Sequence, residues 1–175
     1  MVVTKAESAS LELKLRQLEE RSQAKALAVG MLDLASGASF GYKADRWFHA
    51  ASTIKLAVLL GVFAAFHQGR YVPEARLHVR NRFRSAFDGS AFRVQSERDA
   101  DSEVQSAIGR TMRLSELARN MIIRSSNLAT NLLLDLLGIE FLQRTLDDLE
   151  LKGIELRRGV EDRLACEHGI NNSGT

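Results

Sequence analysis

The pattern of apolar and polar residues along the chain predicts a helix followed by a hairpin at its beginning. Leucines recur at helical spacing between charged residues over 10–24, which predicts an amphipathic helix. The run ALAVGMLDL over 26–34 is typical of an apolar strand, and Ala-Ser-Gly after it is a turn signal. SFGYK over 39–43 is then expected to be the returning strand.

The apolar strand 26–34 reads as one that is buried on both faces. A two-stranded hairpin by itself is marginal in water. We therefore expect further sheet partners or a helical cover, which the remaining sequence does not obviously supply.

A second group of apolar segments predicts a helical core. Residues 52–67 contain LAVLLGVFAAF and are apolar on nearly every side, so we expect a buried helix with Gly69 as its C-terminal cap. Three more helices are expected, over 114–120, 127–137 and 139–149.

The other segments lack a clear period. A variable polar segment is expected over about 80–110, and its stretch 80–109 is predicted to be irregular or loosely helical. The tail 158–175 is predicted to be a loop with a turn or two of helix. With five or six helices and two convincing strands in 175 residues, the chain is predicted to be one α/β (α+β) domain over 1–175.

Composition excludes several classes of function. Lys and Arg number 24 against 22 acidic residues, and a net charge of +2 gives no electrostatic case for binding nucleic acid. Cys166 is the one cysteine, without a thiol-activating motif around it, and the four histidines are far apart. We therefore expect no metal and no cofactor.

The sequence also predicts no membrane segment. MVVTKAESAS over 1–10 lacks the apolar run of a signal peptide, and the apolar stretch 56–66 is too short to cross a bilayer.

The first candidate for chemistry is Ser52-Thr53-Ile54-Lys55, an SxxK motif at the start of the apolar helix. Residues three apart share a helix face, so the Lys55 amine is expected beside the Ser52 hydroxyl. A serine is a weak nucleophile until a base takes its proton, and burial lowers the pKa of a lysine so that it can serve as that base. These four residues alone also fit a capping serine followed by a lysine that reaches water.

The second candidate lies in IRSSNLATNLLLDLLG over 123–138, where Ser125-Ser126-Asn127 forms an SxN motif. By itself it also fits a polar cap at a helix start. SxxK followed by SxN, each beside an apolar helix, and the approach WFHAAS over 47–52 resemble class A β-lactamases and penicillin-binding proteins.

This resemblance covers the chain from about Leu11 to Thr175 and implies a β-lactamase/transpeptidase-like fold without a cofactor. It implies Ser52 as the nucleophile that forms the acyl-enzyme and Lys55 as its base. Ser125 would pass a proton to the departing nitrogen, since a hydroxyl both donates and accepts. Asn127 would hold Lys55 and bind the amide side chain of the substrate, and Asn131 would tie nearby backbone together.

The sequence departs from the family at three places. Ser126 stands where the lactamases have aspartate, which favours the broader superfamily. For the acid that activates water, Glu167 with Asn171 has the family's ExxxN spacing and is the first candidate, with Glu161 second and Asp162 third. These three acids also fit a solvated loop.

The third departure is the absence of a KTG motif. Ser-Gly at 173–174 follows Asn172, and no strand is predicted around it. Family members continue with a helix, three strands and a final helix, so the resemblance implies an N-terminal portion of an incomplete domain. An isolated chain of this kind is expected to be nearly inactive, and to form homo-oligomers or bind a chain that completes its sheet.

The predicted function is a serine hydrolase that forms an acyl-enzyme with a small-molecule substrate, a β-lactam or a peptidoglycan-like amide. A catalytically impaired homologue that serves as a penicillin-binding or assembly module is the alternative. An unrelated helical protein, with Ser52 and Ser125 far apart, is the third interpretation. The resemblance suggests a periplasmic or secreted location if a leader has been removed.

Overall fold

The computed structural model describes residues 5–175, which fall into two compact units that meet in sequence at Trp47 and Phe48. Residues 1–4, part of the segment in which no leader is predicted, lie outside the described residues. The prediction of a single domain over 1–175 stays a prediction. No helix of the described chain is long and apolar enough to span a membrane.

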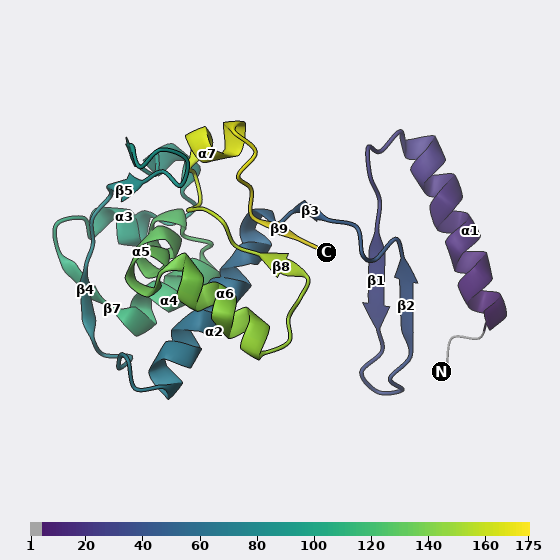
Figure 1. Ribbon diagram of the computed structural model, residues 1–175, viewed down its shortest axis with the longest axis horizontal. Coiled ribbons are helices and arrows are strands. Elements are labelled where there is room, and N and C mark those ends of the chain that lie inside the picture. The colour runs from purple at the N-terminus through teal and green to yellow at the C-terminus, as the bar shows by residue number, and fades with distance from the viewer. Residues whose placement is uncertain (1–4) are drawn as a thin grey trace. The chain divides into compact units, whose positions relative to one another are not determined.

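The N-terminal unit consists of helix α1, Lys5–Ser22, and a hairpin of strands β1, Val29–Leu32, and β2, Ser39–Tyr42 (Figure 1). The predicted helix and antiparallel hairpin are confirmed, with the helix starting earlier. Glu19 of α1 joins the helix to the hairpin, because its Oε2 accepts hydrogen bonds from Tyr42 Oη at 2.7 Å and Lys43 Nζ at 2.6 Å.

The prediction that the first strand is buried on both faces is wrong for this structure. β1 pairs with β2, and its side chains are largely exposed, with Met31 at 43% and Leu32 at 61% of full exposure. The apolar run therefore lacks the cover that its sequence suggests.

The second unit holds the helices and several short strands. It begins with β3, Phe48–His49, the 3-10 turn η1, Ala51–Thr53, and helix α2, Ile54–His67. Its other helices are α3, Ser102–Ser106, α4, Leu114–Ile123, α5, Asn127–Leu137, α6, Ile139–Asp148, and α7, Arg163–Glu167, with the 3-10 turn η2, Ser96–Arg98. The remaining strands are β4, Arg76–His78, β5, Phe83–Arg84, β6, Ala91–Phe92, β7, Thr111–Arg113, β8, Ile154–Glu155, and β9, Ser173–Gly174.

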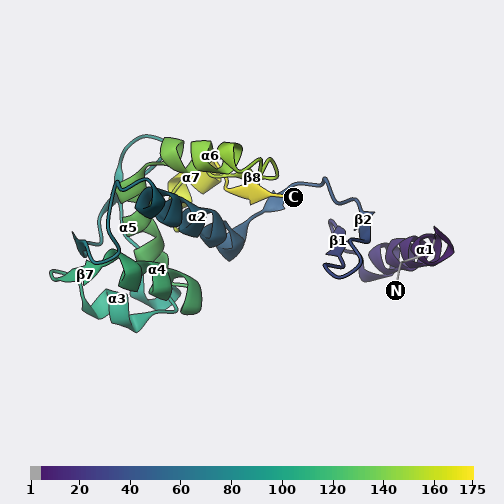
Figure 2. The ribbon, with the colours of Figure 1, turned by 90° about the horizontal axis from the view of Figure 1, so that it is seen from below.

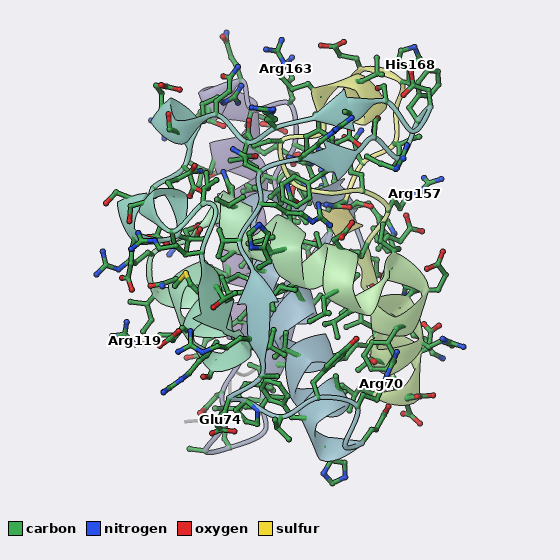
Figure 3. All side chains as sticks on the ribbon, turned by 90° about the vertical axis from the view of Figure 1, so that its left-hand side faces the viewer. Arg70, Glu74, Arg119, Arg157, Arg163 and His168 are labelled. Atoms are coloured by element: carbon green, nitrogen blue, oxygen red, sulfur yellow. The ribbon has the colours of Figure 1, made fainter. Side chains whose placement is uncertain are left out.

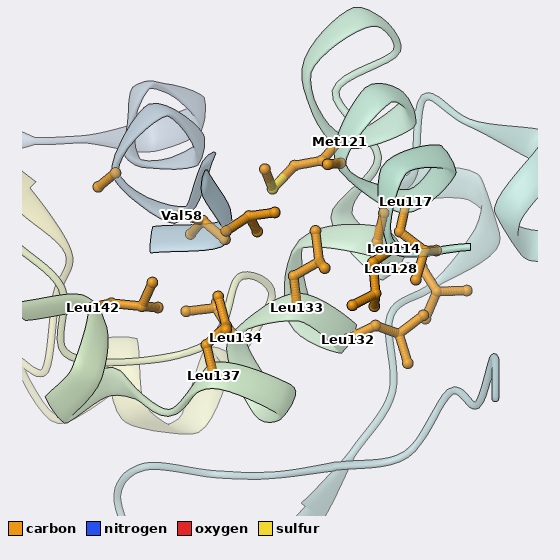
Figure 4. Close-up of a cluster of buried hydrophobic side chains, with 14 of the residues drawn as sticks. Val58, Leu114, Leu117, Met121, Leu128, Leu132, Leu133, Leu134, Leu137 and Leu142 are labelled. Atoms are coloured by element: carbon orange, nitrogen blue, oxygen red, sulfur yellow. The ribbon is translucent and has the colours of Figure 1, made fainter. Parts of the chain in front are cut away.

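Helix α2 packs against α4, α5 and α6, and these four helices enclose the core (Figures 1 and 2). Val58 of α2 lies fully buried beside leucines of α5 and α6 and Met121 of α4 (Figure 4). Each fully buried side chain of this size contributes about 1.5–3 kcal/mol. The predicted helices after residue 110 are confirmed, α5 with the expected bounds. Gly69 follows α2 with φ +67, as expected of a cap.

The prediction that this apolar helix is buried all round is partly wrong. Ile54 and Val58 face the core, whereas Leu56 and Phe63 on the opposite side are 58% and 59% exposed. An all-apolar helix carries no signal of which face the neighbouring helices cover.

Two other predictions are corrected by short strands. Ser173–Gly174 forms β9, the middle strand of a sheet in the order β3-β9-β8, although no strand was expected there. Within 80–109, β5 and β6 form a hairpin, and Val94 and Val104 are buried in the core. The polar composition of that segment conceals the few apolar residues that anchor it.

Candidate active site

The turn η1 places Ser52 directly before α2, one turn from Lys55. Ala51 has φ +46, an uncommon conformation for a residue with a side chain. Strain of this kind costs about 1–3 kcal/mol and concentrates at functional sites. Ser52 is exposed at the surface, while Lys55 is buried with 3% of its surface accessible.

The amine of Lys55 lies at the centre of a hydrogen-bond network. It donates to Ser125 O at 2.6 Å, to Ser125 Oγ at 2.8 Å and to Asn127 Oδ1 at 2.8 Å. Ser52 Oγ lies 3.4 Å from the same nitrogen, and Ser125 Oγ donates to Ser52 Oγ at 3.2 Å. The structure thus brings together the four residues that the two motifs supply, and the interpretation as an unrelated protein with chance motifs is excluded.

The connection between α4 and α5 presents Ser125 and Asn127. Ser125 has φ +56, and Ser126 next to it caps α5 by accepting from Ala129 N at 3.2 Å. Asp99 caps the same helix, with its two carboxylate oxygens accepting from Asn127 N and Leu128 N, each at 2.9 Å. These two caps hold the backbone at the start of α5, and with it the position from which the Asn127 side chain extends.

Burial lowers the pKa of Lys55 below that of a free lysine, because the charged amine is removed from water. The negative charges of Asp99 and Glu161 oppose that effect and raise the pKa. The desolvation is the larger influence, so more of the Lys55 amine is neutral at a given pH than in a free lysine.

A cavity of about 340 Å³ opens beside Ser52. Its wall contains Ser52 and Asn127 from the motifs, together with Arg98, Arg158 and Glu161. Further residues complete the lining: His49, Ala51, Val160, Asp162, Arg163, Cys166 and Asn172. Glu161 has φ +63, and its Oε2 lies 3.2 Å from Arg98 Nε.

The three candidate acids have different positions. Glu161 lines the cavity, whereas Glu167, the first candidate, does not and lies 3.7 Å from Arg163 on exposed α7. The lining of the cavity therefore favours Glu161, the second candidate, over Glu167, and the identity of the acid stays a prediction. Asp162 caps α7 through Ala165 N at 3.2 Å and accepts from Ser85 Oγ at 2.8 Å, so its carboxylate is occupied by structural bonds.

Asn131 ties two segments of backbone together, as the resemblance implies. Its side chain donates to Val160 O and accepts from Val160 N, both at 2.8 Å. This pair of bonds holds the segment that carries Glu161 against α5. Cys166 also lies at the cavity wall, although no chemistry was expected of it.

The sequence reasoning missed Arg98, Asp99 and Arg158. The first two belong to the polar segment 80–109, whose composition gave no signal for a site. Within the described part of the chain, no group of three or more His, Cys, Asp or Glu side chains is arranged to hold a metal ion.

Comparison with known proteins shows similarity to beta-lactamases. A sequence model described as "Beta-lactamase enzyme family" matches residues 10–174. Beta-lactamase ROB-1 of Haemophilus influenzae is 34% identical over 148 residues, which is 82% of this chain and 42% of that protein. The chain therefore spans less than half the length of the curated relatives it matches.

Solved structures share the fold. An ancestral class A beta-lactamase, designated GNCA, matches with a TM-score of 0.69 and 28% identity, over 87% of this chain and 54% of the other. A mutant of PBP-A, solved as an acyl-enzyme complex with penicillin G, matches with a TM-score of 0.67 and 25% identity, over 95% and 57%. The predicted β-lactamase/transpeptidase-like fold is confirmed, and it is partial relative to these larger structures.

Proposed function

Because the chain belongs to the beta-lactamase enzyme family, we propose that it supplies the nucleophile and base of a serine hydrolase that forms an acyl-enzyme with β-lactams or related amides. One observation carries the proposal. A buried lysine amine hydrogen-bonds Ser125 Oγ and Asn127 Oδ1 and lies 3.4 Å from the exposed Ser52 hydroxyl.

Acylation would begin with neutral Lys55. The amine takes the proton of Ser52, directly or through Ser125, as Ser52 Oγ bonds to the carbonyl carbon of the substrate. The carbon–nitrogen bond then breaks, and the departing nitrogen receives a proton from Ser125, which Lys55 replaces. The product is an ester on Ser52, and Lys55 returns to its neutral form.

Release of the acyl group requires water and a second base. We assign this role to Glu161, because it lines the cavity beside Ser52 and the carboxylate of Asp162 is held by structural hydrogen bonds. The oxygen of that water would bond to the ester carbon, Ser52 would recover its proton, and the acid would leave. Asn131 acts on this step indirectly, because it positions the backbone of the segment that carries Glu161.

The ion pair between Glu161 and Arg98 favours a second candidate function. The ion pair directs the Glu161 carboxylate toward the Arg98 guanidinium, so the guanidinium competes with a water molecule for that carboxylate. A protein in which release is slow accumulates as the acyl-enzyme and behaves as a penicillin-binding protein. The substrate is in either case a β-lactam or a peptidoglycan-like amide, and assembly into a homo-oligomer or with a sheet-completing chain is part of the same proposal.

Labelling with a fluorescent penicillin tests the proposal. Because the isolated chain is expected to acylate slowly, it is incubated with the label for a long time; it should then retain the label after denaturation, and mass spectrometry should locate the label on the peptide that contains Ser52. Ser52→Ala should abolish labelling, whereas Ser106→Ala, at an exposed serine of α3 outside the cavity, should not change it. Absence of label, or label that survives Ser52→Ala, would overturn the proposal.

A further inference from the structure

Arg158 is a buried residue in the wall of the cavity beside Ser52. The residue keeps 6% of its surface accessible. One of its terminal nitrogens, Nη1, donates to Gly159 O at 3.0 Å, whereas the buried Nε has no hydrogen-bond partner among the described residues. A buried charged group without a matching partner is unfavourable, so this arrangement needs an explanation.

The other charged residues of the wall are satisfied within the described chain. Arg98 pairs with Glu161 at 3.2 Å, and Arg163 lies 3.7 Å from Glu167. Asp162 accepts from Ala86 N at 2.8 Å in addition to its bonds described above. Among these residues, Arg158 is the cation whose charge no described carboxylate balances within 4.0 Å.

The lining of the cavity shows which part of a substrate would meet Arg158. Ser52 and Asn127 belong to the wall, but Ser125 does not. In the proposed reaction Ser125 faces the departing nitrogen and Asn127 the side chain on the acyl group. The cavity therefore extends from Ser52 toward the acyl side of the bond that breaks.

We propose that Arg158 forms a subsite for an anionic group on the acyl portion of the substrate, so that the preferred substrates are amides whose acyl group bears a carboxylate. The placement on the acyl side rests on the proposed function. A guanidinium binds a carboxylate through charge-assisted hydrogen bonds. Because Nε is closed off from solvent, the carboxylate would bond to the other terminal nitrogen, Nη2, for which the described residues provide no hydrogen-bond partner.

Two penicillins that differ by one carboxylate provide the test. α-Carboxybenzylpenicillin carries an extra carboxylate on the side chain of benzylpenicillin, while the ring carboxylate is common to both. Affinities are measured by calorimetric titration into the Ser52→Ala protein, in which the acylation step is removed. We expect the extra carboxylate to tighten binding by roughly tenfold to a hundredfold, the usual strength of a hydrogen-bonded charge pair.

Variants of Arg158 assign the preference to this residue. Arg158→Gln should abolish the difference between the two penicillins, and Arg158→Lys should retain part of it. Arg157→Gln is the matched control, because Arg157 is exposed, lies outside the cavity wall and extends away from the fold (Figure 3). Thermal melting shows whether each variant folds. The comparison of the two penicillins on the protein with native Arg158 tests the subsite even if a variant of Arg158 does not fold.

A second pair of compounds identifies the source of the carboxylate. N-succinyl-D-alanyl-D-alanine and N-acetyl-D-alanyl-D-alanine differ in the same way on a peptide. A preference for the acidic member in one pair supports the subsite and assigns it to that substrate class. Equal affinities in both pairs, no binding of any compound, or a preference that survives Arg158→Gln would overturn it. Loss of penicillin labelling with a retained acid preference would overturn the acylation proposal alone.

Discussion

The Lys55 amine lies closer to Ser125 than to Ser52, with 2.8 Å between Nζ and Ser125 Oγ against 3.4 Å to Ser52 Oγ. Lys55 also donates to Ser125 O at 2.6 Å, so two bonds fix this residue against the amine. Since Ser125 Oγ in turn donates to Ser52 Oγ at 3.2 Å, the shortest contacts form a path from Ser52 through Ser125 to Lys55. In the proposed acylation Ser125 would relay the proton along this path, once the donors and acceptors of both hydrogen bonds exchange roles, as a hydroxyl and a neutral amine can.

The lowered pKa of Lys55 predicts how acylation depends on pH. The neutral amine is the active form of the base, so the labelling rate should rise as pH increases through the pKa of the folded protein and then level off. The midpoint should lie below about 10.4, the value for a free lysine. Stopped-time labelling across a pH series measures it, and a midpoint at or above that value contradicts the assignment of Lys55.

The same pKa has a consequence for stability. The folded protein binds a proton at Lys55 less readily than the unfolded chain, so this residue makes the free energy of unfolding increase with pH between the folded and unfolded pKa values. Lys55→Met should remove that contribution and flatten the dependence, as measured by urea unfolding at several pH values. An unchanged slope would show that Lys55 is not desolvated.

Replacement of each candidate acid separates their roles. Glu161→Gln should slow release of the acyl group by about 10²–10⁴-fold, the usual contribution of a general base, while labelling of Ser52 continues. Glu167→Gln is the matched control and should leave release unchanged, because Glu167 lies outside the cavity wall. The decay of the fluorescent acyl-enzyme measures both, and a reversed pattern would restore the choice based on the ExxxN spacing.

Asp99 connects the stability of α5 to the chemistry of Lys55. Asp99→Asn leaves one oxygen for the two backbone donors of Asn127 and Leu128, which should cost about 1–3 kcal/mol in the free energy of unfolding. It also removes a charge that raises the pKa of Lys55, so the labelling profile should move to lower pH. Asp88→Asn, in an exposed turn, is the control and should change neither. A loss of stability without a shift of the profile would limit Asp99 to a capping role.

The sequence by itself determined the parts of this protein that local geometry fixes. Ser52 and Lys55 are three residues apart at a helix start, so their motif specifies that the two side chains share a face. Ser125 and Asn127 flank the start of another helix, so their motif specifies where that helix begins. The bounds of α5 were predictable because its apolar run ends at Gly138, whose φ of +81 suits a glycine.

Only the tertiary structure decided which side chains from distant segments of the chain lie near these motif residues. The ExxxN spacing favoured Glu167, yet α7 leaves that residue paired with Arg163, and the path of the preceding segment brings Glu161 into the wall instead. Arg98 and Asp99 lie in a polar segment without a motif. Spacing along a chain fixes neighbours one turn apart, whereas contacts between distant segments depend on how the whole core packs.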